Sequence, residues 1–298
     1  MANTRDITRR IKSVKNTKKI TKAMEMVSSS KMRRAVNKLM SSRPYASLAW
    51  GMLANIAKKT DLNLHPLLQK KDEIKKIGVI LITSNRGLCG SFNQQVVKKV
   101  LEYLKLNKEN AQVEVVAMGK KGASTMAKMS YTVSAQFDKA DVVEEVAVIS
   151  PLSHLAVKGY LDNTYDKVLL VYTDYVSSLK QEPRVKVLLP LTGEADANLG
   201  QVAGEKEEKV IENFEYLFEP NPKEILGALL PRLVEVQIYQ ALLESNASEH
   251  SARMLAMRNA SDAAGDMIDE LTLAFNQARQ ANITREIAEI AGGKAALE

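Results

Sequence analysis

The feature that most constrains this chain is a regular spacing of apolar and small residues along its C-terminal part. The spacing alternates between three and four residues over about seven heptads, which is typical of a coiled coil. A helix from 223 to about 290 would be about 100 Å long, several times the mean length of helices in globular proteins. We expect Pro220 and Pro222 to mark its start, and Gly292 and Gly293 to end it. The seam consists of Leu226, Leu229, Leu233, Val236, Gln240, Leu243, Ala247, His250, Met254, Met257, Ser261, Ala264, Ile268, Leu271, Phe275 and Ala278.

The N-terminal part of the chain shows a similar pattern. Residues 4 to about 59 contain one glycine, Gly51, and one proline, Pro44, so the pattern predicts a second helix of about 80 Å. Pro44 should kink this helix or cost about 3 kcal/mol unless a packed partner compensates. An offset stripe of Ile20, Met24 and Val27 accompanies the seam. The seam consists of Ile7, Ile11, Val14, Lys18, Thr21, Glu25, Ser28, Met32, Ala35, Leu39, Ser42, Ala46, Ala49, Leu53 and Ile56.

The two terminal helices are predicted to pair with each other. Small or polar seam residues such as Gln240, Ala247 and Ser261 suit a close antiparallel partner better than a dimerising zipper, which prefers Leu and Ile. Residues 1–60 hold fifteen Lys and Arg against two acids, and residues 223–298 hold seven against eleven. The opposite charges and the shared chain favour an intramolecular antiparallel coiled coil, or shaft.

The middle of the chain has a different rhythm, in which short apolar runs alternate with amphipathic stretches. This pattern predicts a Rossmann-like α/β domain with a mostly parallel sheet and helices on both faces. The predicted domains are the N-terminal shaft helix at 1–60, the α/β domain at 75–210, and a foot segment with the C-terminal shaft helix at 211–298. Residues 191–208 are acidic and predicted to form a loop. The predicted strands are Ile77–Thr83, Val113–Met118, Tyr131–Phe137, Val168–Tyr172 and Val185–Leu189. One predicted helix ends near Leu106, and another covers 141–162 and is interrupted near Pro151.

Two glycine-containing turns follow predicted strands, as a phosphate-binding loop would. Neither Ser84–Gly90 nor Gly119–Gly122 has the Gly-Lys-Ser/Thr of a P-loop or the three glycines of a dinucleotide site. We therefore interpret both as tight strand-to-helix turns. The sequence predicts no cofactor and no catalysis.

Cysteine and histidine are too few to form a reactive or metal-binding cluster. The single cysteine, Cys89, excludes an internal disulfide and is expected to be a semi-buried thiol. The histidines His65, His154 and His250 are scattered, and His250 on the seam is expected to be packed or hydrogen-bonded. No signal peptide is apparent and no run approaches the roughly 18 apolar residues of a membrane span. We expect a soluble protein in a reducing cytoplasm.

The basic N-terminal helix leaves more than one partner open. It could be a solvated face, or it could bind an acidic protein or nucleic acid. A basic coiled coil that binds nucleic acid and an α/β nucleotide enzyme with helical arms are therefore alternatives to a shaft.

Several motifs in sequence order resemble the gamma subunit of rotary ATP synthases. The resemblance covers the whole chain and is weakest at about 105–210. It implies the central rotor shaft of a bacterial ATP synthase, which couples proton flow through a ring of c subunits to ATP synthesis in a ring of alpha and beta subunits, and which also binds epsilon. The motifs are Asn16–Val27, Ser30–Arg33, Ser42–Tyr45, Arg86–Gly90, Tyr216–Pro220, Ser248–Met254 with Ala256 and Met257, and Ala278–Thr284.

The resemblance also implies roles for individual residues. The subunit itself is expected to be non-catalytic and to lie at the cytoplasmic face of the bacterial inner membrane, without binding nucleic acid. Asn85 departs from the family's usual Asp, and the tail with Lys294 and Glu298 is less apolar than the family's sleeve would favour. The implied contacts are Lys18, Lys19, Lys22 and Met24 with the beta subunit, Arg253, Arg279, Gln280 and Thr284 with the surrounding ring, and Tyr216, Phe218 and Glu219 with the c-ring.

Overall fold

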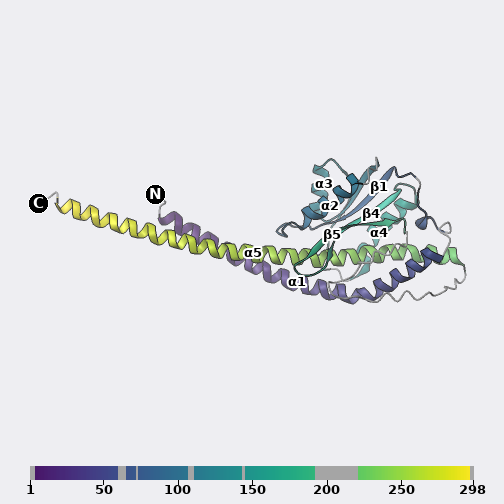
Figure 1. Cartoon of the computed structure of the whole chain (residues 1–298), viewed down its shortest axis with the longest axis horizontal. Helices are drawn as coiled ribbons and strands as arrows, with labels where there is room; N and C mark the ends of the chain where they lie inside the picture. Colours follow the sequence, from purple (N-terminus) through teal and green to yellow (C-terminus); the bar gives the residue numbers. More distant parts are fainter. Residues whose placement is uncertain are drawn as a thin grey trace. The chain divides into compact units, whose positions relative to one another are not determined.

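The described part of the chain falls into two compact units. The computed structural model describes residues 4–59, 65–71, 73–106, 111–142, 145–191 and 221–295 (Figure 1). One unit combines residues 1–28 with 254–298, and the other spans 29–253. Helix α1 (Thr4–Lys59) and helix α5 (Pro222–Ala295) each contribute to both units.

The second unit contains a five-stranded sheet in the order β3-β2-β1-β4-β5. The first four strands in this order are parallel, which confirms the predicted mostly parallel sheet. Strand β5 is antiparallel to β4 because the turn between them is too short for the crossover that a parallel pair needs. The strands are β1 (Lys76–Ile82), β2 (Gln112–Met118), β3 (Thr132–Phe137), β4 (Lys167–Tyr175) and β5 (Gln181–Leu189).

Helices cover both faces of this sheet, as predicted. On β1 the side chains of Val79 and Leu81 pack into one core with α2 (Phe92–Leu106) and α3 (Lys120–Lys128). The alternate side chains, Ile80 and Ile82, pack into a second core with α4 (Ser150–Leu161), α5 and the 3-10 turn Pro66–Leu68. Figure 1 shows α5 passing along the sheet within this unit.

Within the second unit, α5 packs against the sheet on one side and α1 on the other. The Ser42 hydroxyl on α1 donates a 3.0 Å hydrogen bond to Gln240 Oε1 on α5. Every residue from Leu233 to Ser251 is buried. An 18-residue window of Lys223–Ala291 has a mean hydropathy of 1.2, high enough for a membrane span, but 67% of it is buried inside the protein. By length and composition alone this stretch could cross a membrane, so the expectation that no run approaches a membrane span was wrong. Its apolar residues fit its surroundings, because a helix enclosed on several sides needs apolar residues all round.

The first unit pairs the start of α1 with the end of α5, so the two helices are antiparallel. A Cβ added to Gly265 would lie 2.9 Å from Lys18 Nζ, so the side chain of Lys18 on α1 reaches across to α5. The offset residues Ile20 and Val27 are 60% and 56% exposed. The buried residues of this unit all occupy predicted seam positions: Ile7, Thr21 and Ser28 on α1, with Met257, Ser261 and Ala264 on α5. The antiparallel coiled coil is confirmed.

Several predicted boundaries were wrong. Helix α5 continues through Gly292 and Gly293 to Ala295, because a glycine costs only about 1 kcal/mol in a helix. By contrast, α1 is one helix from Thr4 to Lys59 through Pro44, which confirms the predicted helix over residues 4 to about 59. Pro151 does not interrupt a helix over 141–162; it lies in the first turn of α4, where its missing N–H is not needed. The acidic loop at 191–208 falls almost entirely outside the described residues.

Candidate functional site

The four residues predicted to contact the beta subunit lie on α1 in the first unit. Lys18, Lys19 and Lys22 are exposed, and Met24 is half-buried. Lys22 forms an ion pair of 2.9 Å with Glu25 one turn further on. Because both partners are on α1 and the lysine is 57% exposed, this pair is easily exchanged for a partner's carboxylate.

Exposed apolar side chains accompany these lysines. Ile20, Met26 and Val27 are each at least 56% exposed. Alternating cations and large apolar groups form a surface that can bury area and pair charge at the same time, which is typical of an interaction site. The sequence pattern indicated Ile20 and Val27 only as part of an offset stripe and gave no sign that Met26 is exposed.

The last turns of α5 carry three of the residues predicted to contact the ring. Arg279, Gln280 and Thr284 are all exposed. Three isoleucines nearby are also exposed, at spacings of four and three residues that place them along one side of the helix: Ile283 at 47%, Ile287 at 61% and Ile290 at 75%. Their spacing was available in the sequence, so this apolar stripe could have been predicted.

Arg253, the fourth residue of that set, is engaged within the second unit. Its side chain is 11% exposed and its Nη2 lies 2.8 Å from Glu249 Oε1. The same guanidinium donates hydrogen bonds of 3.4 Å to the carbonyl oxygens of Arg86 and Gly87 in the β1–α2 turn. The structure therefore places Arg253 in a contact between α5 and the carboxyl edge of the sheet.

Glu249 joins Arg253 to a second buried cation. Lys139 Nζ lies 2.8 Å from Glu249 Oε2 and donates a 3.1 Å hydrogen bond to the Ser245 hydroxyl. The same ammonium lies 5.4 Å from the centre of the Phe92 ring. Burial of Glu249 favours its neutral form, but Lys139 and Arg253 outweigh this effect and hold the pKa of Glu249 below its ordinary value.

The β1–α2 turn is held by hydrogen bonds within the turn and to Lys139. Ser84 Oγ donates to the Arg86 carbonyl at 2.6 Å, and Asn85 Nδ2 donates to the Lys139 carbonyl at 2.8 Å.

In the second glycine-containing turn, Gly119 has φ of 110°, and a Cβ there would lie 2.3 Å from the Thr83 carbonyl oxygen. The glycine at this second turn is therefore required by a close backbone approach, which supports the interpretation of a tight turn.

His250 and Cys89 are both packed inside the second unit. His250 Nε2 lies 3.1 Å from the Asp141 carbonyl oxygen, which confirms a hydrogen-bonded imidazole, and burial lowers its pKa. Cys89 is buried and lies 3.4 Å from Asn93 Nδ2. Among the described residues, no group of three His, Cys, Asp or Glu side chains could hold a metal ion.

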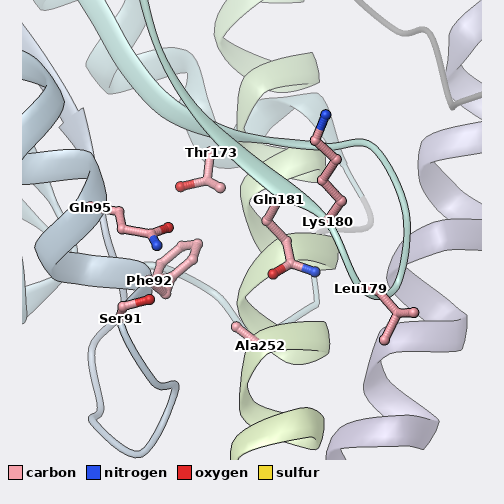
Figure 2. Close-up of a pocket in the computed structure, with 8 residues that line it drawn as sticks. All are labelled: Ser91, Phe92, Gln95, Thr173, Leu179, Lys180, Gln181 and Ala252. Atoms are coloured by element: carbon pink, nitrogen blue, oxygen red, sulfur yellow. The ribbon is translucent and has the colours of Figure 1, made fainter.

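A small pocket opens beside α2, β4, β5 and α5, with a volume of about 280 Å³ (Figure 2). The hydroxyl of Thr173, one of the lining residues, is itself buried. The Gln181 amide already donates to the carbonyl oxygens of Ser177 and Ser178. We assign no cofactor to this pocket, whose lining is Ser91, Phe92, Gln95, Thr173, Leu179, Lys180, Gln181 and Ala252.

The predicted c-ring contacts Tyr216, Phe218 and Glu219 lie outside the described residues. Lys139 and Glu249 were missed as a pair by sequence reasoning. The available signal was the charged motif at 248–253 on the seam of the predicted helix, but nothing in the sequence identifies its partner 110 positions away.

Known proteins resemble this chain over its full length. The family model described as ATP synthase matches residues 3–297. The ATP synthase gamma chains of Herpetosiphon aurantiacus and Nitrosospira multiformis are each 40% identical to this chain, cover all of it, and are themselves covered to 99% and 100%.

Solved structures show the same fold. A chain from the central stalk and c-ring of Tetrahymena thermophila mitochondrial ATP synthase is 26% identical, with a TM-score of 0.61 over 81% of this chain and 99% of that one. A chain from the Euglena gracilis mitochondrial ATP synthase, in the OSCP/F1/c-ring part, is 20% identical, with a TM-score of 0.65 over 99% and 94%. From the family model and the 40% identical relatives, this chain belongs to the ATP synthase gamma family.

Proposed function

We infer that this chain is the central rotor shaft of an ATP synthase, coupling proton flow through a c-ring to ATP synthesis or hydrolysis in a ring of alpha and beta subunits. The observation that carries this function is the antiparallel pairing of the chain's two ends in a protein with 40% identity to gamma chains over its whole length. A paired helix resists bending and twisting far better than a single helix, because each helix packs along the other.

The charges of the first unit give the shaft two different sides. Residues 4–28 on α1 hold eight Lys and Arg against two acids, whereas residues 254–298 hold four against seven. A rotor can bias a catalytic site only if its orientations differ in interaction free energy with that site. A basic helix beside an acidic one meets this requirement, since about 1.4 kcal/mol already shifts a two-state equilibrium tenfold.

The proposed contacts are those that membership of the gamma family implies. Lys18, Lys19, Lys22 and Met24 would meet an acidic surface of the beta subunit. Arg279, Gln280 and Thr284, and the exposed part of Arg253, would contact the surrounding ring, and Tyr216, Phe218 and Glu219 the c-ring. We further propose that the α/β domain binds epsilon, and that the c-ring holds the chain at the cytoplasmic face of a bacterial inner membrane. Catalysis would belong entirely to the alpha and beta subunits.

Replacing Met24 by Lys tests the shaft contact. The variant adds charge to a half-buried position of α1 next to three lysines, so the number of protons pumped per ATP hydrolysed should fall in the reconstituted complex. The matched control is Met129→Lys, the same change at a 47% exposed methionine after α3, which should pump as the parent does. An unchanged proton-to-ATP ratio in Met24→Lys would contradict the placement of this residue.

The nucleic-acid alternative has no support from these relatives, and we do not propose it. If it were correct, the isolated chain would bind DNA with an affinity that falls steeply with salt.

A further inference from the structure

The segment that follows β3, residues 138–142, is fastened to α5 although it has no regular secondary structure. The Asn246 side chain on α5 donates a 3.2 Å hydrogen bond to the Ala140 carbonyl oxygen. One turn further along α5, His250 Nε2 lies 3.1 Å from the Asp141 carbonyl oxygen. Because both side chains bind main-chain oxygens, α5 determines where this segment lies.

The same segment also connects α5 to α1 within the second unit. Lys31 on α1 forms an ion pair with the Asp141 carboxylate, and the main-chain oxygen of Asp141 is the partner of His250. Near the other end of the segment, Lys139 Nζ reaches Glu249 on α5. Release of the segment from His250 would therefore displace the carboxylate that holds Lys31.

The His250 imidazole is enclosed and uses only one of its two nitrogens. The residue is 2% exposed. A carbonyl oxygen can only accept, so Nε2 carries the hydrogen and Nδ1 of the neutral ring carries a lone pair. Nδ1 is buried and has no hydrogen-bond partner among the described residues. A proton added to Nδ1 would therefore create a buried charge and a buried donor without an acceptor, which is unfavourable.

Charged groups from α5, the segment, α1 and the β1–α2 turn surround the imidazole. Its two acidic neighbours are already paired with lysine or arginine side chains. The pKa of Asp141 is lowered by its hydrogen bond with Lys31, and that of Glu249, despite burial, by Lys139 and Arg253, so both acids stay ionised down to about pH 5.5. The imidazole is therefore the group in this cluster that can change charge in mild acid. The charged groups are Glu249 and Arg253 on α5, Lys139 and Asp141 in the segment, Lys31 on α1, and Arg86 in the β1–α2 turn.

We propose that His250 is an acid-sensitive latch: its neutral imidazole fastens residues 138–142 to α5, and protonation of its Nδ1 in mild acid releases this segment together with its contact to Lys31. Release exposes the ring, so that water accepts the hydrogen on Nδ1 and solvates the charge. Little has to move, because the segment lacks secondary structure and both Asp141 and Val142 are already exposed. The latch lies wholly within the second unit, so it operates in the chain alone, whether or not the chain turns inside a complex.

The direction of the effect follows from proton linkage. Burial lowers the pKa of His250 below its ordinary value of 6.5, so the released ring binds a second proton more readily than the latched ring does. The stabilisation from the latch is fully present above about pH 6.5 and declines as the pH falls below that value toward the folded pKa. Glu249 acts in a lower range, because its contribution is present above about pH 4.5.

Hydrogen–deuterium exchange of the full chain at pH 7.5 and pH 5.5 tests the latch. After correction for the intrinsic effect of pH, exchange of residues 138–142 in the parent should rise by up to about tenfold, because a released imidazole is about nine-tenths protonated at pH 5.5. His250→Gln supplies an amide N–H in place of Nε2–H and does not titrate, so its segment should stay protected. His154→Gln is the matched control: it removes an exposed histidine on α4 and should behave as the parent. No rise in the parent, or the same rise in His250→Gln, would overturn the proposal.

Nitrogen NMR of the histidine rings tests the latch in the parent itself, so the result does not depend on a variant that folds. At pH 7.5 the signals of His250 should show the hydrogen on Nε2 and none on Nδ1. As the pH falls, the ring should become charged only as residues 138–142 lose their protection from exchange. A hydrogen on Nδ1 at pH 7.5, or a charged ring while the segment stays protected, would exclude the latch.

Discussion

Lys139 and Glu249 are 110 positions apart in the chain, yet their side chains meet at 2.8 Å where solvent is almost excluded. Each side chain is at most 7% exposed. Neither residue could be buried alone, because an uncompensated buried charge costs several kcal/mol. This pair, with Arg253, fixes α5 against the carboxyl edge of the sheet, which is where α/β proteins commonly bind ligands.

Lys139→Met should therefore destabilise the chain by about 3 kcal/mol, because it leaves Glu249 with Arg253 as its only cation. Urea denaturation at pH 7 measures the loss. The double variant Lys139→Met with Glu249→Leu should recover part of it, because both buried charges are then removed. A single variant as stable as the parent would mean that the pair contributes little.

The same pair predicts how stability changes in acid. The pKa of Glu249 is lowered in the folded chain, so its contribution is present above about pH 4.5 and is lost as the pH falls through the folded pKa. Thermal unfolding at decreasing pH should show this loss in the parent and a smaller one in Glu249→Gln. Equal acid sensitivity in both chains would contradict the assignment.

A glycine provides the third prediction about stability at this scale. Gly119→Ala should cost about 2 kcal/mol or more, because φ is 110° and the new Cβ would lie 2.3 Å from the Thr83 carbonyl oxygen. Gly87→Ala is the control, since a Cβ there meets nothing within 4 Å. Denaturant unfolding of both variants gives the comparison, and equal stability would show that the turn tolerates a side chain.

At the scale of elements, the seam of the coiled coil could be predicted because its period is a local property of the sequence. Each seam position needs only its neighbours three and four residues away, and Thr21, Ser28 and Ser261 are buried as expected although they are polar. The start of β5 could not be predicted as well. The apolar run that predicted this strand begins at Val185, but β5 begins at Gln181 and includes Pro183, because an edge strand tolerates proline where no ladder hydrogen bond is required.

Long-range pairing is the part of the candidate site that sequence reasoning could not supply. The lysines of α1 could be identified from their motif, since all of them lie within a few residues of one another. The contact of Glu249 with Lys139 depends on how α5 lies on the sheet. No spacing in the sequence encodes that geometry. A seam residue such as Leu243 does not indicate where α5 meets the sheet.

The small seam residues of the first unit make their own prediction. Ala264→Leu should destabilise the helix pair by about 1 to 3 kcal/mol, because Ala264 is 7% exposed at a close approach of α1 and α5. Ala263→Leu adds the same side chain at an exposed position one residue earlier and should have little effect. Thermal unfolding of both variants separates the cases, and a stable Ala264→Leu chain would contradict close packing at this seam.

At the scale of the whole molecule, the chain divides its tasks between two units. The first unit pairs a basic stretch with an acidic one and exposes lysines, isoleucines and a methionine. The second unit encloses α5 between a sheet and α1, and inside it Glu249 pairs with Lys139 and Asp174 pairs with Arg184. The exposed features of one unit suit contacts with other subunits, and the enclosed helix of the other suits a rigid attachment.

Rotation of this chain within the assembled complex is the most direct test of the account. Lys128→Cys places a single reactive thiol on an exposed position at the end of α3, since the native Cys89 is buried, and a bead attached there reports the chain's orientation. With the alpha and beta ring fixed to a surface and ATP supplied, the account predicts continuous rotation in one direction at a rate set by ATP hydrolysis. A bead that stays in place while the same complexes hydrolyse ATP would contradict it.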